Sequence, residues 1–322
     1  MRSTSTLFVA AAVLSFLVTP PVAAQAFPSK PVRLVVPFPA GGTGDVIARM
    51  LSAPLTRALG QNLLVDNRPG GGTVIGTELV ARSPADGHTM LMVFNTFAIN
   101  PGVRPKLPFD TVKDFAGVTK LATTPLVFAV HPSLPAKQLR DLVAIARARP
   151  GELTYGTPVL GGASHIAGEM FKQMAKIDLV HVPYQGAAPA TIAVLGGHTT
   201  ILLGNVSDVV PHAAVGRLRP LAVGSLERSP VLKDVPTVAE SYPGFEATLW
   251  VGAVVPKATP RDALLRLNTE FGRALDSADL RSGLDKLGLS GAAGTPEQFE
   301  AFLTAEMRRN GETARKANIR IE

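Results

Sequence analysis

Short apolar runs alternate with amphipathic stretches of helical period along most of this chain. Apolar runs rich in β-branched residues indicate buried strands, and apolar residues spaced three and four apart indicate helices. The predicted strands are residues 32–38, 63–66, 89–94, 126–130, 154–156, 179–183, 201–204, 218–223 and 249–255. The predicted helices are residues 45–59, 74–82, 136–149, 164–175, 189–195, 206–215, 260–275, 280–287 and 295–316. This alternation predicts an α/β fold with parallel strands, and the length predicts two lobes.

A glycine-rich turn joins the first predicted strand to the first predicted helix. Residues 39–45 read Pro-Ala-Gly-Gly-Thr-Gly-Asp, directly after an apolar run that ends at Phe38. Small residues leave the N–H groups of a helix start accessible, and the positive end of the helix dipole adds to their attraction for an anion. The turn therefore predicts an anion site. Asp45 is expected to act as the N-cap of its helix, with direct ligand contact as the alternative.

A second turn of the same kind follows the predicted strand 154–156. Residues 157–164 read Thr-Pro-Val-Leu-Gly-Gly-Ala-Ser and lead into another helix. Two helix starts suited to anions predict two loops that face each other across a cleft. His165 lies in the first turn after this loop and is a further candidate for ligand contact.

The first residues and the composition indicate an exported protein. Arg2, an apolar core over 7–18 and the sequence Ala24-Gln25-Ala26 predict a signal peptide, 1–26, cleaved before Phe27. Cysteine is absent, which excludes disulfides, thiolate nucleophiles and zinc–thiolate sites. The formal charge of +7 includes Arg2, and the remaining excess suits an anionic small ligand, an acidic membrane surface or nucleic acid. Scattered basic residues and few aromatic ones argue against nucleic acid.

Motifs for catalysis, nucleotides and metals are weak or missing. Gly42-Thr43-Gly44 begins like a dinucleotide fingerprint, but Ile47 stands where its third glycine belongs; Asp66 could serve as the acidic residue that follows. No lysine follows these glycines as in a phosphate-binding loop, and no G-x-S-x-G elbow occurs. The six histidines have no metal-binding spacing, so neither a metal nor a cofactor is expected.

Seven segments, taken together and in order, resemble one family. They are residues 37–45, residues 66–72 with Gly76 beyond, and residues 83–89, 98–101, 153–156, 182–184 and 234–240. They resemble the periplasmic solute-binding receptors of tripartite tricarboxylate transporters, also called Bug-type receptors, over essentially the whole chain after residue 26. The resemblance implies a type II periplasmic-binding-protein fold, in which two α/β lobes joined by a two-crossing hinge close on a small carboxylate.

The resemblance also implies the lobes and the ligand contacts. Lobe 1 is expected to contain residues 27–124 and 224–322, and lobe 2 residues 125–223. The implied ligand-binding residues are Phe38, Ala40, Gly41, Gly42, Thr43, Asp45, Thr96, Gly161, Gly162, Ala163, Ser164, His165 and Asn205, with backbone amides and bridging waters holding the carboxylate. The chain departs from the family at Gln185, where members often have Lys or Arg. It also lacks acidic residues over 199–204, which argues against an amino-acid ligand.

The sequence thus predicts a periplasmic, monomeric, non-enzymatic receptor that delivers a small carboxylate to a membrane permease. The alternative is an enzyme that uses the same cleft, such as a nicotinamide-dependent oxidoreductase.

Overall fold

The computed structural model describes residues 27–321, so the predicted signal peptide, 1–26, and Glu322 lie outside the described residues. The elements are, in order, β1 (Val32–Val36), α1 (Thr43–Leu59), β2 (Leu63–Asn67), η1 (Gly71–Thr73), α2 (Val74–Ala81), β3 (Thr89–Phe94), α3 (Asn95–Val103), β4 (Phe115–Val130), α4 (Leu139–Ala148), β5 (Thr154–Thr157), α5 (Ala163–Ala175), β6 (Val180–Pro183), α6 (Ala187–Leu195), β7 (Ile201–Asn205), α7 (Val206–Ala214), β8 (Arg219–Val223), η2 (Val238–Glu240), β9 (Thr248–Pro256), α8 (Arg261–Asp276), α9 (Ala278–Lys286), β10 (Ser290–Gly291) and α10 (Pro296–Lys316).

The strands follow the order β2-β1-β3-β9-β4-β7-β5-β6, with β8 and β10 also paired to β4. As predicted, β1 pairs in parallel with β2 and β3, and β5 pairs in parallel with β6 and β7. The expectation of parallel strands fails at the centre, where β4 and β9 run antiparallel to their neighbours and to each other. This difference arises because these two strands cross between the two halves of the molecule in opposite directions.

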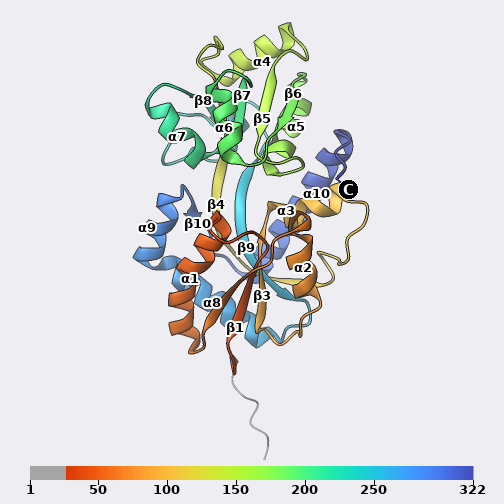
Figure 1. The fold of residues 1–322 in the computed structure, drawn as a ribbon, viewed down its shortest axis with the longest axis vertical. Coiled ribbons are helices and arrows are strands. Elements are labelled where there is room, and N and C mark those ends of the chain that lie inside the picture. The colour runs from red at the N-terminus through yellow and green to blue at the C-terminus, as the bar shows by residue number, and fades with distance from the viewer. Residues whose placement is uncertain (1–26, 322) are drawn as a thin grey trace, which may run out of the picture.

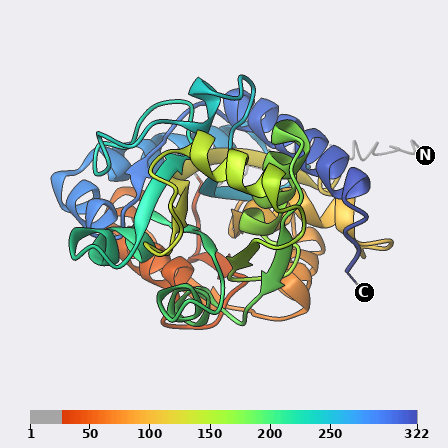
Figure 2. The ribbon, with the colours of Figure 1, turned by 90° about the horizontal axis from the view of Figure 1, so that it is seen from above.

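The long strand β4 serves both halves. Its first part, up to Pro125, pairs with β9, and its last part, from Leu126 onward, pairs with β7 and β8. The change of partner divides the described chain into two lobes, seen as the lower and upper parts of Figure 1, with β4 and β9 running between them. Figure 2 shows the green elements of the upper lobe lying over the lower lobe.

Each lobe has its own hydrophobic core. In the lower lobe the sheet packs against α1 and α8 on one face, with Leu34, Leu51 and Phe271 fully buried between them. The other face packs against α10 through Trp250 and Phe299. The upper lobe has a separate core in which Phe128 packs against Phe171 and Phe245.

The lobe boundary after β8 differs from the expectation that lobe 1 resumes at residue 224. The side chains of Val238, Phe245 and Ala247 belong to the core of the upper lobe. The chain leaves that lobe only where Leu126 donates its N–H to the Ala247 carbonyl oxygen at 3.2 Å and β9 begins at Thr248. We therefore propose Thr248 as the second crossing, because a boundary at 224 would separate these buried side chains from the core they fill.

A third contact between the lobes lies at the end of the described chain. Ile319 and Ile99 of the lower lobe form an apolar cluster with Ile166 of α5. Ile321 donates its N–H to the Val103 carbonyl oxygen at 2.9 Å and also lies against Gly161 in the loop before α5. Within residues 27–321, no helix has the length and apolar character that crossing a bilayer requires.

Candidate functional site

The first glycine loop leaves the start of α1 without a side-chain cap. Its N-cap is Gly42, with extended backbone at φ −78°, and the first intrahelical bond runs from the Val46 N–H to the Gly42 carbonyl at 3.0 Å. The N–H groups of Thr43, Gly44 and Asp45 therefore have no acceptor within the helix. By contrast, the N-cap of α10 is Thr295, whose hydroxyl accepts the N–H of Gln298 at 3.2 Å.

Asp45 does not act as the expected N-cap. It is the third residue of α1, and its Oδ2 accepts the Gly41 N–H at 2.9 Å and the Arg49 Nε–H at 2.9 Å. Hydrogen bonding from Arg49 holds the pKa of this carboxyl below its usual range. Asp45 thus stays ionised, and its carboxylate holds the glycine loop against the start of α1 by accepting the Gly41 N–H. Gly41 needs to be glycine because its φ is +81°.

The second glycine loop repeats this geometry. Gly162 is the N-cap of α5 at φ −79°, Gly161 has φ +69°, and the Ile166 N–H donates to the Gly162 carbonyl at 3.0 Å. The Gly161 N–H donates to Nδ1 of His165 at 3.0 Å, across the same spacing of four residues as Gly41 and Asp45. The N–H groups of Ala163, Ser164 and His165 are again free of intrahelical partners. The two loops differ in the group that accepts the N–H of their first glycine. It is the Asp45 carboxylate in the first loop and the His165 imidazole in the second.

His165 belongs to a buried cluster that sequence analysis found only in part. Its ring stacks on that of His181, with centroids 3.7 Å apart and planes 9° from parallel. Burial lowers the pKa of each histidine to about 4, so both are neutral at neutral pH. Because Nδ1 of His165 accepts a hydrogen bond, its proton resides on Nε2. His181 was missed because 16 positions separate it from His165. The two rings meet only in the fold, where β6 places His181 beside β5 and His165 lies on α5, the helix that follows β5.

The other candidates of the lower lobe lie at the same edge of the sheet as the first loop. Strands β1, β2 and β3 are parallel, so the segments that follow them meet at one edge. The Phe38 ring packs on Phe94 at a centroid distance of 4.7 Å, and Asn67 donates to the Phe38 carbonyl at 3.1 Å. Thr96 follows β3 and accepts a hydrogen bond from Thr73 at 3.3 Å. Ala40 is exposed within the first loop.

Asn205 lies on the upper lobe, next to the first crossing. It is the register partner of Leu126 and precedes α7. Its N–H donates to the Asp208 carboxylate at 3.0 Å, so this N–H is already used at the start of α7. Its assignment as a ligand residue remains a prediction.

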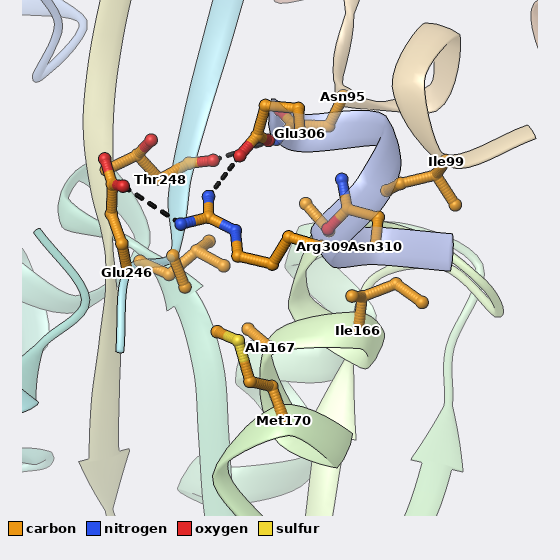
Figure 3. A pocket seen from close by; sticks show the side chains of 13 residues that line it. Asn95, Ile99, Ile166, Ala167, Met170, Glu246, Thr248, Glu306, Arg309 and Asn310 are labelled. Carbon is orange, nitrogen blue, oxygen red and sulfur yellow. Dashed lines mark hydrogen bonds and ion pairs between the residues drawn. The ribbon is translucent and has the colours of Figure 1, made fainter. Parts of the chain in front are cut away.

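A small polar pocket lies between the lobes at the hinge (Figure 3). Arg309 of α10 donates to Glu246 at 2.9 Å, just before the second crossing, and also pairs with Glu306. Glu306 is buried and accepts the Trp250 indole N–H at 3.0 Å. Figure 3 shows Ile166 and Met170 of α5 lining the opposite side. Sequence analysis missed this network because its members lie in two segments far apart in the sequence, residues 246–250 and residues 306–309.

The residues of the alternative nucleotide site are engaged elsewhere. Asp66 accepts a hydrogen bond from Arg33 at 2.6 Å and another from Arg68 at 3.0 Å. Ile47, at the position of the missing third glycine, is buried in the lower core. Within residues 27–321, no cluster of three or more His, Asp or Glu side chains is suited to holding a metal ion.

Comparison with known proteins identifies the family. The family described as "Tripartite tricarboxylate transporter family receptor" matches residues 47–319. The chain belongs to this family. It is 34% identical to Protein BugT of Bordetella pertussis, over 94% of each chain. A structure of an R. palustris protein with adipate is similar at 34% identity and a TM-score of 0.77, covering 91% of this chain and 99% of that one. MatC from Rhodopseudomonas palustris, solved with bound malate, is 29% identical with a TM-score of 0.73, covering 89% and 99%.

The receptor family agrees with the two-lobed α/β architecture, and the predicted type II periplasmic-binding-protein fold is confirmed by these structural matches. The family also confirms the predicted role as a solute-binding receptor of a transporter.

Proposed function

We propose that this receptor captures a small carboxylate between its lobes and delivers it to the permease of a tripartite tricarboxylate transporter. The observation that supports this proposal most directly is the pair of matched glycine loops, each presenting three first-turn N–H groups beneath a glycine N-cap. Such N–H groups with a helix dipole behind them are donors suited to a carboxylate. The adipate and malate found in related structures are ligands of this chemical class.

Closure follows from the division of donors between the lobes. Residues 43–45 belong to one lobe and residues 163–165 to the other, so a ligand that contacts both sets binds the closed arrangement better than the open one. A ligand shifts a conformational equilibrium only by such a difference in affinity. The crossings at Leu126 and Thr248 provide the hinge, and water molecules complete the contacts to the carboxylate.

The proposal extends to the compartment, the oligomeric state and the activity of this receptor. After removal of residues 1–26 it is a monomeric periplasmic protein, and the cleft carries out no reaction. Two observations disfavour the nicotinamide alternative: Asp66 is paired with arginines, and Ile47 fills the position where a third glycine would let helix and strand approach closely.

A thermal-shift and calorimetric panel tests the proposal. Malate, adipate and the uncharged dimethyl ester of adipate are compared, with NAD and NADH as probes of the alternative. Binding at a concentration one hundred times Kd stabilises a protein by about 2.7 kcal/mol, which a melting curve resolves easily. We expect stabilisation by at least one dicarboxylate and none by the diester. Stabilisation by NADH alone would refute the receptor assignment of this cleft.

A further inference from the structure

The loop between β2 and α2 contains four consecutive residues with positive φ. Gly70, Gly71 and Gly72 have φ values of +127°, +57° and +62°, and Thr73 follows at +79°. Glycine adopts these conformations freely, but a β-branched residue there is a strained outlier. Such strain persists only where the surrounding structure imposes it, and it concentrates at functional sites. A fourth glycine would remove the strain, so the threonine side chain itself requires an explanation.

The threonine hydroxyl lies in a directed chain of hydrogen bonds. Arg104 donates from Nε to Oδ1 of Asn100 at 3.3 Å, which turns the Asn100 amide group toward the loop. Nδ2 of Asn100 donates to the Gly72 carbonyl at 3.0 Å and lies 3.5 Å from Oγ1 of Thr73. Thr73 in turn donates to Oγ1 of Thr96 at 3.3 Å.

This series of hydrogen bonds determines whether the Thr96 hydroxyl acts as a donor or as an acceptor toward a ligand. A hydroxyl carries one proton and two acceptor sites. Because Thr96 accepts from Thr73, its own proton is available to another acceptor. Thr96 is half-buried and follows β3 at the edge of the sheet where the first glycine loop also lies. Thr73 itself is 5% exposed, so its own contact with a solute is small.

We propose that Thr73 is a positioning residue that makes Thr96 a hydrogen-bond donor to the ligand carboxylate, and that its left-handed backbone is retained for this purpose. The inference deepens the proposed function and rests on it. Arg104 lies at the opposite end of this series of hydrogen bonds from Thr96. Its positive charge polarises the bonds in the direction that favours donation by Thr96 to an anion.

The test is a double-mutant cycle of Thr73→Gly and Thr96→Val, with malate and adipate as probes and ligand-free melting measured in parallel. Thr73→Gly relieves the strain and removes the hydroxyl, so we expect affinity to fall about tenfold, equivalent to about 1.4 kcal/mol, without a loss of melting temperature. Thr73→Ser retains the hydroxyl and should keep affinity within about twofold of the unmodified protein. In the Thr96→Val background, Thr73→Gly should have no further effect on affinity.

Each other outcome overturns the inference in a recognisable way. Unchanged affinity in Thr73→Gly, or an equal loss in the Thr96→Val background, shows that Thr73 does not act through Thr96. A lowered melting temperature with unchanged affinity shows that the threonine serves the fold alone. If the unmodified protein binds none of the carboxylates, the proposed function fails and the inference fails with it.

Discussion

Helix α1 begins without a side-chain cap, and this leads to a prediction that one substitution will lower ligand affinity while leaving folding stability almost unchanged. Gly42 and Gly41 are adjacent but differ in backbone conformation, with φ values of −78° and +81°. A side chain at an N-cap position folds back over the N–H groups of the second and third helical residues, which is how serine or aspartate caps a helix. Gly42→Val should therefore place methyl groups where the carboxylate would meet the N–H groups of Gly44 and Asp45.

The expected effects of Gly42→Val on melting temperature and on carboxylate affinity follow from the surroundings of its Cβ and of the N–H groups it would cover. A Cβ on Gly42 would lie 3.4 Å from the Pro39 carbonyl oxygen, so the fold accommodates it and we expect little change in melting temperature. A hydrogen bond to a charged group contributes about 1.5–3 kcal/mol. Losing two such bonds should weaken carboxylate binding by roughly two to four orders of magnitude.

Gly41→Ala is the matched control. A Cβ at this position meets no heavy atom within 4 Å, so it does not obstruct the loop, but the left-handed backbone penalises it. We expect a loss of about 1–2 kcal/mol in stability. Although the resemblance implied Gly41 as a ligand residue, its N–H is already donated to Asp45, so affinity should be largely retained. The lower lobe is the better choice for this pair, because a Cβ on Gly161 would collide with Ile321.

Calorimetric titration with the dicarboxylate that binds the unmodified protein, alongside urea unfolding of the ligand-free variants, measures both quantities. Normal affinity in a well-folded Gly42→Val variant would remove the first glycine loop from the site. A large loss of stability in that variant would instead show that the glycine is required by the fold.

Three further predictions concern the hinge, the histidine pair and export. Arg309→Met should lower the free energy of unfolding by about 3 kcal/mol, because it leaves the buried Glu306 without its ion-pair partner; an unchanged urea midpoint would contradict this. The folded-state pKa of His165 and His181 is near 4, below the usual 6.5, so the unfolded chain binds more protons between these values. Stability should therefore be full above pH 6.5 and decline as the pH falls toward 4, with a shallower decline in His181→Gln, measured by unfolding at several pH values. Protein recovered from a bacterial periplasm should have the mass of a chain beginning at Phe27, and full-length protein in the membrane fraction would contradict the signal assignment.

Local patterns in the sequence predicted most of the elements, because strands such as β1 and helices such as α1 carry their own periodicity. The short elements η1, η2 and β10 were not predicted, and two longer stretches, α3 and the first part of β4, were missed for identifiable reasons. Helix α3 contains Pro101 and has apolar residues on all sides, so it lacks an amphipathic pattern. The first part of β4 includes Lys120 among small and polar residues, and it is a strand because β9 pairs with it, a partner more than 120 positions away along the chain.

The candidate site was predictable only to the level of loops. Glycines 41, 42, 161 and 162 predicted two helix starts. The side chains that accept the Gly41 and Gly161 N–H groups, Asp45 and His165, depend on geometry that sequence spacing alone does not define. Asp45 was expected at the N-cap and instead reaches back to Gly41 from the first turn. The relation between Thr73 and Thr96 requires two segments 23 residues apart to meet, and nothing in either segment indicates the other.

The comparison of the two loops also bears on how a basic protein holds an anion. The charged group that closes the first loop is Asp45, and Arg49 offsets its charge; the group that closes the second is the neutral His165. Neither helix start contributes a net positive side chain to the anion site proposed for it. In the proposed binding mode, attraction at the site comes from oriented backbone N–H groups, which act over a short range and require close fit. The excess of lysine and arginine over acidic residues along the chain suits the longer-range task of raising the local concentration of anions. In the proposed binding mode, the two loops then select among those anions.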